Sequence, residues 1–91
     1  MSDRRSPEEL LTFPCLYEYK VFGVADDQGF CPAIVAAVSR FVPLSGDAVR
    51  TRLSSGGRYQ CVTVLVHLET GKQLSQIYAA LRALEGVRYL L

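Results

Sequence analysis

The sequence predicts an α+β domain in which a four-stranded antiparallel sheet carries two helices on one face. Apolar residues change their period along the chain in the order strand, helix, strand, strand, helix, strand. Each helix therefore joins two strands as a crossover, and crossovers of this kind are right-handed. The 91 residues suffice for one such domain with a compact apolar core. Together these observations indicate the ferredoxin-like βαββαβ sandwich.

Residues 1–14 are expected to form a polar tail that runs into a short helix. Ser6 and Glu9 have the spacing of a capping box at the start of that helix. The tail lacks the apolar stretch of a secretory signal, and no run in the chain approaches the length of a membrane-spanning helix. We therefore expect a cytoplasmic protein whose domain proper covers residues 15–91.

The first strand is expected over residues 16–24, which are rich in β-branched and aromatic side chains. The alternation separates two sets of side chains, with Tyr17, Tyr19 and Val21 facing the core and Glu18, Lys20 and Phe22 on the opposite face. Apolar residues then recur at helical spacing, so the first helix is expected to begin near Cys31 and to run through Val42. Asp26 or Asp27 is a candidate for its cap.

The second strand is expected over residues 47–54, where arginines at 50 and 52 alternate with apolar residues and threonine. A glycine-rich hairpin at 54–58 leads into the third strand at 59–68. In that strand three valines face one way, and the opposite face carries Cys61, Thr63, Leu65 and His67.

The second helix is expected to start at a capping box formed by Thr70 and Gln73. An amphipathic stripe of apolar residues follows, and Gly86 is a natural end for the helix. Residues 87–91 are then expected to form the last strand.

Three runs of sequence resemble one known family. They are residues 13–23 (FPCLYEYKVFG), 54–63 (SSGGRYQCVT) and 87–91 (VRYLL), and they resemble the YbeD-like family of small bacterial proteins in order and spacing. The resemblance covers nearly the whole chain from Leu10 onward. It implies a fold similar to ACT-type regulatory domains and a role in ligand sensing or partner binding. It supplies no catalytic residues.

This chain departs from the family pattern at three positions. Cys15, Leu16 and Cys61 stand where threonine, proline and serine are expected. These changes are too small to threaten the fold, but they argue against a chemical role for Cys15 or Cys61. The three cysteines, including Cys31, read as reduced, partly buried apolar residues, and neither a metal site nor a cofactor is expected.

The candidate site is the sheet face away from the helices. Ten basic and nine acidic residues give a net charge of +1, so any basic surface must come from local clustering. The alternation places four cations on this face against Glu18 alone, a local charge of about +3. The expected ligand or partner face consists of Lys20, Phe22, Arg50, Arg52, Leu65, Arg88 and Leu90. The alternative is an ordinary solvated surface.

A second candidate site is the turn between the first strand and the first helix. Asp26, Asp27 and Gly29 weakly resemble the loop with which ACT domains hold small ligands. Backbone amides at the helix start favour an anion, whereas the two aspartates oppose one. The alternative is an ordinary capped turn.

The function expected from the sequence is that of a non-catalytic binding or regulatory module. A protein partner or a homodimer is expected through the sheet face or through the exposed edge of the second strand, and a small ligand is possible. RNA binding on the basic face is the alternative, although Phe22 is the single well-placed aromatic residue and nucleic acid is therefore not the expected partner. An acylphosphatase-like hydrolase is disfavoured by Asp26 and Asp27, which would repel a phosphate after the first strand. No enzyme activity is expected.

Overall fold

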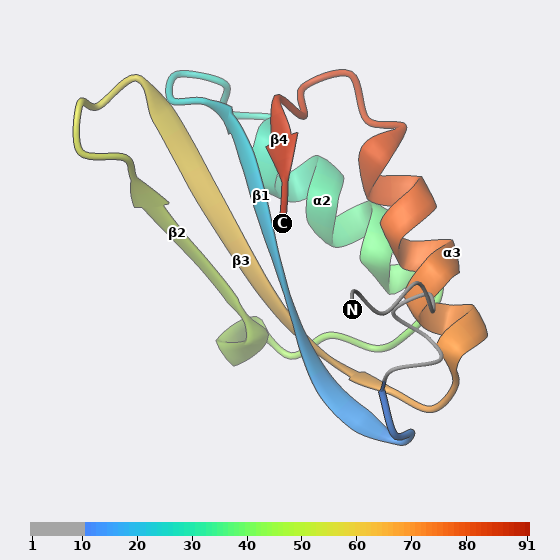
Figure 1. The fold of residues 1–91 in the computed structure, drawn as a ribbon. Helices are drawn as coiled ribbons and strands as arrows, with labels where there is room; N and C mark the ends of the chain where they lie inside the picture. The colour runs from blue at the N-terminus through green and yellow to red at the C-terminus, as the bar shows by residue number, and fades with distance from the viewer. Residues whose placement is uncertain (1–10) are drawn as a thin grey trace, which may run out of the picture.

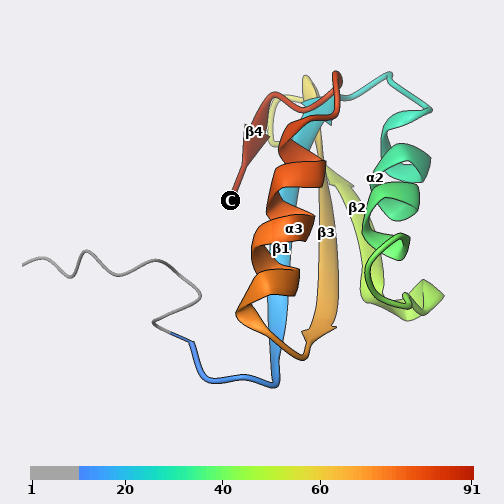
Figure 2. The ribbon, with the colours of Figure 1, turned by 90° about the vertical axis from the view of Figure 1, so that its right-hand side faces the viewer.

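The computed structural model describes residues 11–91 as one antiparallel sheet with both helices on the same side (Figures 1 and 2). The strands lie in the order β2-β3-β1-β4, so β2 and β4 form the two edges. This arrangement confirms the ferredoxin-like fold. The elements are β1 (Cys15–Val24), α2 (Phe30–Ser39), a 3-10 turn (Gly46–Ala48), β2 (Val49–Leu53), β3 (Tyr59–Leu68), α3 (Gly71–Arg82) and β4 (Tyr89–Leu90).

The hydrophobic core lies between the sheet and the two helices. In the central pair of strands, Tyr19 lies opposite Val64 and Val21 opposite Val62, and all four side chains are fully buried. The helices close the core with their apolar stripes. The buried helix residues are Phe30, Ile34, Ala37, Val38, Leu74, Ile77 and Leu81. The alternation predicted for the first and third strands is therefore confirmed.

Helix α2 ends three residues before the expected position. The amides of Phe41 and Val42 both donate to the carbonyl of Val38, at 3.0 and 3.1 Å. Two donors on one carbonyl close the last turn and end the helix. The second strand is also shorter than expected, because Gly46–Ala48 forms a 3-10 turn before it.

The two helices begin differently. Thr70 caps α3 as expected, because its Oγ1 accepts from the amide of Gln73 at 3.3 Å. The return bond goes from the amide of Glu69 to Gln73 Oε1, at 2.7 Å, rather than from Thr70 itself. Helix α2 has no side-chain cap, so the capping role expected for an aspartate is wrong. Asp27 Oδ1 instead accepts from the amide of Gly29, at 3.1 Å.

Of the expected N-terminal tail, only residues 11–14 lie in the described part of the chain. They form no helix, and Phe13 packs against the core. The capping box expected at Ser6 and Glu9 lies outside the described residues. Within residues 11–91 neither helix combines the length and apolar character that crossing a membrane requires.

The turn between β1 and α2 is held in place by Gln60, the buried polar residue of β3. Its Nε2 donates to the carbonyls of Val24 and Asp27, at 2.9 and 2.8 Å. Both carbonyls also accept a backbone amide, from Asp27 and Phe30 respectively. One side chain thus joins the third strand to the start of the first crossover.

We expect Gln60→Leu to lower the free energy of unfolding by about 1–2 kcal/mol, because two hydrogen bonds are lost while each carbonyl keeps one donor. Urea unfolding would measure the change. Gln76→Leu, at an exposed position of α3, is the matched control and should leave stability nearly unchanged. Equal stability of the two variants would contradict this role for Gln60.

Candidate functional site: the open sheet face

The sheet face that points away from the helices is uncovered in the described structure (Figure 1). We call it the open face, and the strand register identifies its members. They are Leu16, Glu18, Lys20 and Phe22 of β1, Arg50 and Arg52 of β2, Tyr59, Cys61, Thr63, Leu65 and His67 of β3, Tyr89 of β4, and Leu91 beyond it.

Two rows of side chains cross the open face from edge to edge. In the first row, Arg52 lies opposite Cys61, Cys61 opposite Phe22, and Phe22 opposite Tyr89. The second row is parallel to it and contains Arg50, Thr63 and Lys20. The backbone of Leu91 extends this row, because it exchanges hydrogen bonds of 2.8 and 3.1 Å with Lys20. The structure therefore brings together five of the seven predicted residues, namely Lys20, Phe22, Arg50, Arg52 and Leu65.

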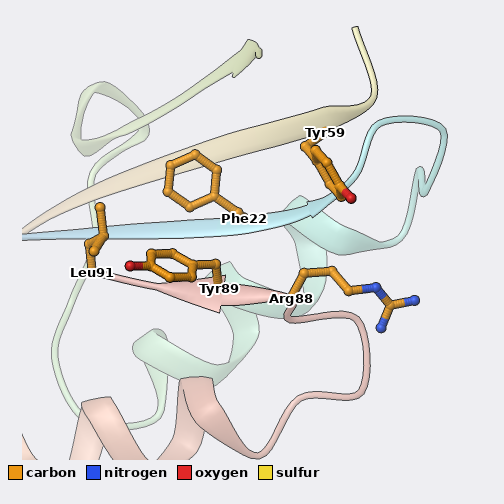
Figure 3. A pocket seen from close by; sticks show the side chains of 5 residues that line it. All are labelled: Phe22, Tyr59, Arg88, Tyr89 and Leu91. Atoms are coloured by element: carbon orange, nitrogen blue, oxygen red, sulfur yellow. The ribbon is translucent and has the colours of Figure 1, made fainter. Parts of the chain in front are cut away.

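The other two predicted residues are placed differently. Leu90 pairs with the buried Val21 and packs against the core, so its expected position on the open face is wrong. Arg88 precedes the paired residues of β4 and has the parity of Leu90 in the chain. Its exposed side chain nevertheless lines a pocket with Phe22 and Tyr59, so it stands at the rim of the open face (Figure 3).

An aromatic pocket occupies one end of the open face. Its volume is about 310 Å³, and it is lined by Phe22, Tyr59, Arg88, Tyr89 and Leu91 (Figure 3). The Phe22 and Tyr89 rings meet edge to face, with centroids 6.0 Å apart. Tyr59 and Tyr89 were not predicted from the sequence as site residues. The parity of Tyr59 was readable from the valines of β3, whereas that of Tyr89 depends on pairing with β1.

A basic groove of about 400 Å³ crosses the middle of the open face. Lys20, Arg50 and Arg52 line it together with two carboxylates, those of Glu18 and Asp47. Lys20 Nζ lies 3.8 Å from Glu18 Oε1, whereas no ion pair among the described residues involves either arginine. With Arg88 as a fourth cation, the side chains of the groove and the aromatic pocket sum to +2. This is below the expected value of about +3, because Asp47 adds a second carboxylate to that of Glu18.

An apolar hollow lies at the other end of the face. Leu16, Leu65 and His67 line it together with the loop that precedes the 3-10 turn. The imidazole of His67 is exposed, with Nδ1 3.4 Å from Glu69 Oε1. The basic groove therefore lies between two apolar regions.

The turn with Asp26, Asp27 and Gly29 makes its own hydrogen bonds. The Asp27 carboxylate accepts a hydrogen bond from the amide of Gly29. The amides of Asp27 and Phe30 donate to carbonyls within the turn. An anionic ligand would have to displace that carboxylate. The geometry matches the ordinary turn better than a ligand loop.

The cysteines and the histidine do not form a reactive cluster. Cys15 and Cys31 are half-buried and Cys61 is buried, which matches the expectation of partly buried thiols. Within residues 11–91 no three histidine, cysteine or acidic side chains gather as a metal site would require.

The fold and this face define a ferredoxin-like domain with an uncovered, mixed aromatic and basic sheet surface. The chain belongs to the family described as "Protein of unknown function (DUF493)", whose model matches residues 8–91.

Its curated relatives include the UPF0250 proteins of Shewanella woodyi and Shewanella loihica. The first is 38% identical over 85 residues, covering 92% of this chain and 93% of that protein. The second is 42% identical over 84 residues, covering 91% and 92%. The family resemblance found in the sequence is confirmed, and neither name states a catalytic activity.

Solved structures agree on the fold. The solution structure of protein HP0495 from H. pylori matches with a TM-score of 0.71 at 17% identity, over 100% of this chain and 93% of that one. The ACT domain from the GTP pyrophosphokinase of Chlorobium tepidum matches with a TM-score of 0.61 at 18% identity, over 84% and 94%. The similarity to ACT domains is thus also confirmed at the level of the fold.

Proposed function

We propose that this protein is a non-catalytic, regulatory binding module of the bacterial cytoplasm that holds a partner protein on its open face. The observation that carries the proposal is the basic groove, where Arg50 and Arg52 have no ion-pair partner among the described residues and lie between two apolar regions. Arginine mixed with aromatic and aliphatic side chains is the composition that protein interfaces favour.

The distribution of exposed apolar side chains supports this surface. Within residues 11–91 eight large apolar side chains are exposed, and five of them belong to the open face. The five are Leu16, Tyr59, Leu65, Tyr89 and Leu91. Leu16 and Tyr89, at opposite ends of the face, are 66% and 58% exposed. Such clustering on one side of a small domain marks an interaction surface more often than a solvated one.

The charges indicate what kind of partner fits. A segment with aspartate or glutamate would pair with Arg50 and Arg52, while apolar side chains beside it would fill the aromatic pocket and the apolar hollow. A second copy of the chain fits less well face to face, since its own net positive groove would meet another positive groove.

The same side chains support a role without catalysis. His67 is exposed and lies beside Glu69, and the polar neighbour of the Cys61 thiol is Thr63, at 3.9 Å. Within residues 11–91 the contact of His67 is thus with a carboxylate and that of Cys61 with a hydroxyl, so these contacts do not pair a nucleophile with a base as covalent catalysis requires. After β1, where a phosphate-binding loop would have to lie, the turn instead presents Asp26 and Asp27.

The proposal is tested by quantitative affinity capture from the bacterial cytosol with Arg50→Glu/Arg52→Glu as the altered bait. We expect a partner protein to be captured by the wild type and lost from this variant. The partner, once purified, should bind the wild type directly and bind the variant at least tenfold more weakly.

The matched control is Arg40→Glu/Lys72→Glu, which reverses two exposed cations, one directly after α2 and one in α3. It should retain the partner, since neither residue lies on the open face. Sedimentation of the isolated protein tests for a homodimer. If the wild type is a dimer and the Arg50→Glu/Arg52→Glu variant is a monomer, the partner on the open face is a second copy of the chain. Capture and self-association that are the same for all three baits would refute the proposal.

A further inference from the structure

A second hollow lies on the other side of β4 from the aromatic pocket. We call it the edge cleft; its volume is about 420 Å³, and its lining comes from α3 and the last strand. The lining residues are Tyr78, Arg82, Val87, Arg88, Tyr89 and Leu90. Arg88 and Tyr89 line the aromatic pocket as well, so the two hollows meet across β4.

The charged groups of the edge cleft all have one sign. Its two ionisable side chains besides the tyrosines are Arg82 and Arg88, and no aspartate or glutamate lines either this cleft or the aromatic pocket. Neither arginine takes part in an ion pair among the described residues. The two guanidinium groups and the Tyr78 hydroxyl are hydrogen-bond donors suited to phosphate oxygens.

The aromatic pocket offers a different chemistry a short distance away. The rings of Phe22 and Tyr89 are in contact, Tyr59 lines the same pocket from β3, and Leu91 adds an aliphatic wall (Figure 3). Aromatic side chains on an uncovered sheet are the surfaces on which nucleobases stack. Both hollows are within the size range of small-molecule sites.

The backbone fixes how the two hollows are joined. The amide of Arg88 donates to the carbonyl of Phe22 at 2.8 Å. This bond fixes the backbone of Arg88 at the rim of the aromatic pocket, and its side chain extends from there. The amide of Val87 donates to the carbonyl of Leu84 at 3.2 Å, which ties the same segment to the end of α3 where Arg82 lies. A planar group and an anionic group can therefore be held on the two sides of one short strand.

We propose that the β4 edge binds a nucleotide unit, with the base against Phe22, Tyr59 and Tyr89 and the phosphate on Arg82 and Arg88. This chemistry is shared by a free mononucleotide and by one nucleotide of a single-stranded RNA. The nucleotide and the proposed partner protein would share the aromatic pocket, but the phosphate is assigned to Arg82 and Arg88 and not to the arginines of the basic groove.

The test is a titration of the full-length protein, followed by amide chemical shifts, with adenosine 5′-monophosphate as the probe. We expect saturable shifts around Phe22, Tyr59, Arg82 and Arg88. Adenosine lacks the phosphate and ribose 5-phosphate lacks the base, so each should bind at least about tenfold more weakly than the nucleotide.

Variants separate the two halves of the site. Arg82→Gln/Arg88→Gln should weaken binding of the nucleotide at least tenfold, and Tyr89→Leu should weaken it independently by removing a ring. All of these side chains are exposed, so the fold should survive; unchanged circular dichroism would verify that. Lys72→Gln, on the same helix but outside the cleft, is the control and should bind as the wild type does.

An eight-residue oligoadenylate distinguishes the two sources of the nucleotide. Shifts that extend to Lys20, Arg50 and Arg52, with affinity that falls steeply as salt rises, identify a single-stranded RNA. Shifts and affinity like those of the mononucleotide identify a free nucleotide.

The proposal is overturned if neither probe at about 1 mM shifts the amides around Phe22, Tyr59, Arg82 and Arg88. It is also overturned if the arginine and tyrosine variants bind the nucleotide as tightly as the wild type. Failure here is separable from failure of partner binding, because Arg50→Glu/Arg52→Glu should leave mononucleotide affinity unchanged.

Discussion

Replacing Gly23 with valine is expected to lower the free energy of unfolding by about 3 kcal/mol, at the upper end of what overpacking costs. A Cβ at this buried position would lie 2.6 Å from Cε1 and Cζ of the Phe30 ring, which is itself buried. Because the ring is part of the core, moving it away from the new side chain would disturb its core neighbours. For a domain of this size the melting temperature should fall by more than about 10 °C, which thermal unfolding would measure.

The matched control is Gly46→Val, since a Cβ added there meets nothing within 4 Å. It should change stability far less than Gly23→Val. Gly23→Ala should also lose stability. Combining it with Phe30→Leu, which replaces the opposing ring by a smaller side chain, should recover part of that loss. If Gly23→Val unfolds at the temperature of the wild type, the close approach of Phe30 to β1 is wrong.

The protein is expected to lose stability in alkali through Tyr19. Burial raises the pKa of this phenol above its ordinary value, and negative charge on Tyr17 and Cys15 raises it further. The folded state therefore holds the proton more tightly than the unfolded state does. The resulting stabilisation is complete below the unfolded pKa of about 10 and is lost as pH rises through and beyond that value. Each pH unit in that window should lower the free energy of unfolding by about 1.4 kcal/mol.

Tyr19→Phe tests this dependence, with urea unfolding measured between neutral pH and about pH 12. At neutral pH the variant should lose about 1 kcal/mol, because the Tyr19 hydroxyl donates to the carbonyl of Leu74 at 2.9 Å. Above pH ~10 its stability should fall less steeply than that of the wild type. Tyr78→Phe, at an exposed position of α3, should retain the full alkaline loss. Parallel pH curves for Tyr19→Phe and the wild type would rule out this linkage.

The fold and most of the open face could be predicted because β1 and β3 alternate cleanly. Glu18 and Lys20 separate core residues in β1, and Thr63 and His67 do so in β3. A shift of one position would therefore bury Lys20 or expose Val64. The same alternation placed Arg50 and Arg52 correctly. The central half of the candidate site follows from side-chain parity alone.

The β4 end of the site could not be predicted in this way. Residues 87–91 read VRYLL, in which apolar side chains occupy both faces, so parity is decided by pairing with β1. That pairing turns Tyr89 outward and Leu90 inward, the reverse of the expected arrangement. Gln60 was missed for a related reason. Its partners are backbone carbonyls 36 and 33 residues away, and sequence patterns carry no signal for such contacts.

The two edges of the sheet are attached to the rest of the molecule with unequal strength. β2 pairs with β3 at five positions, from Val49 to Leu53, whereas β4 pairs with β1 at two, Tyr89 and Leu90. Transient detachment of β4 would dismantle the wall made by Tyr89 and Leu91 while the helices still covered the valines of β3. Local opening of this kind needs less free energy than unfolding of the whole domain. Loss of the ligand-facing surface and collapse of the domain are thus separate events in this molecule.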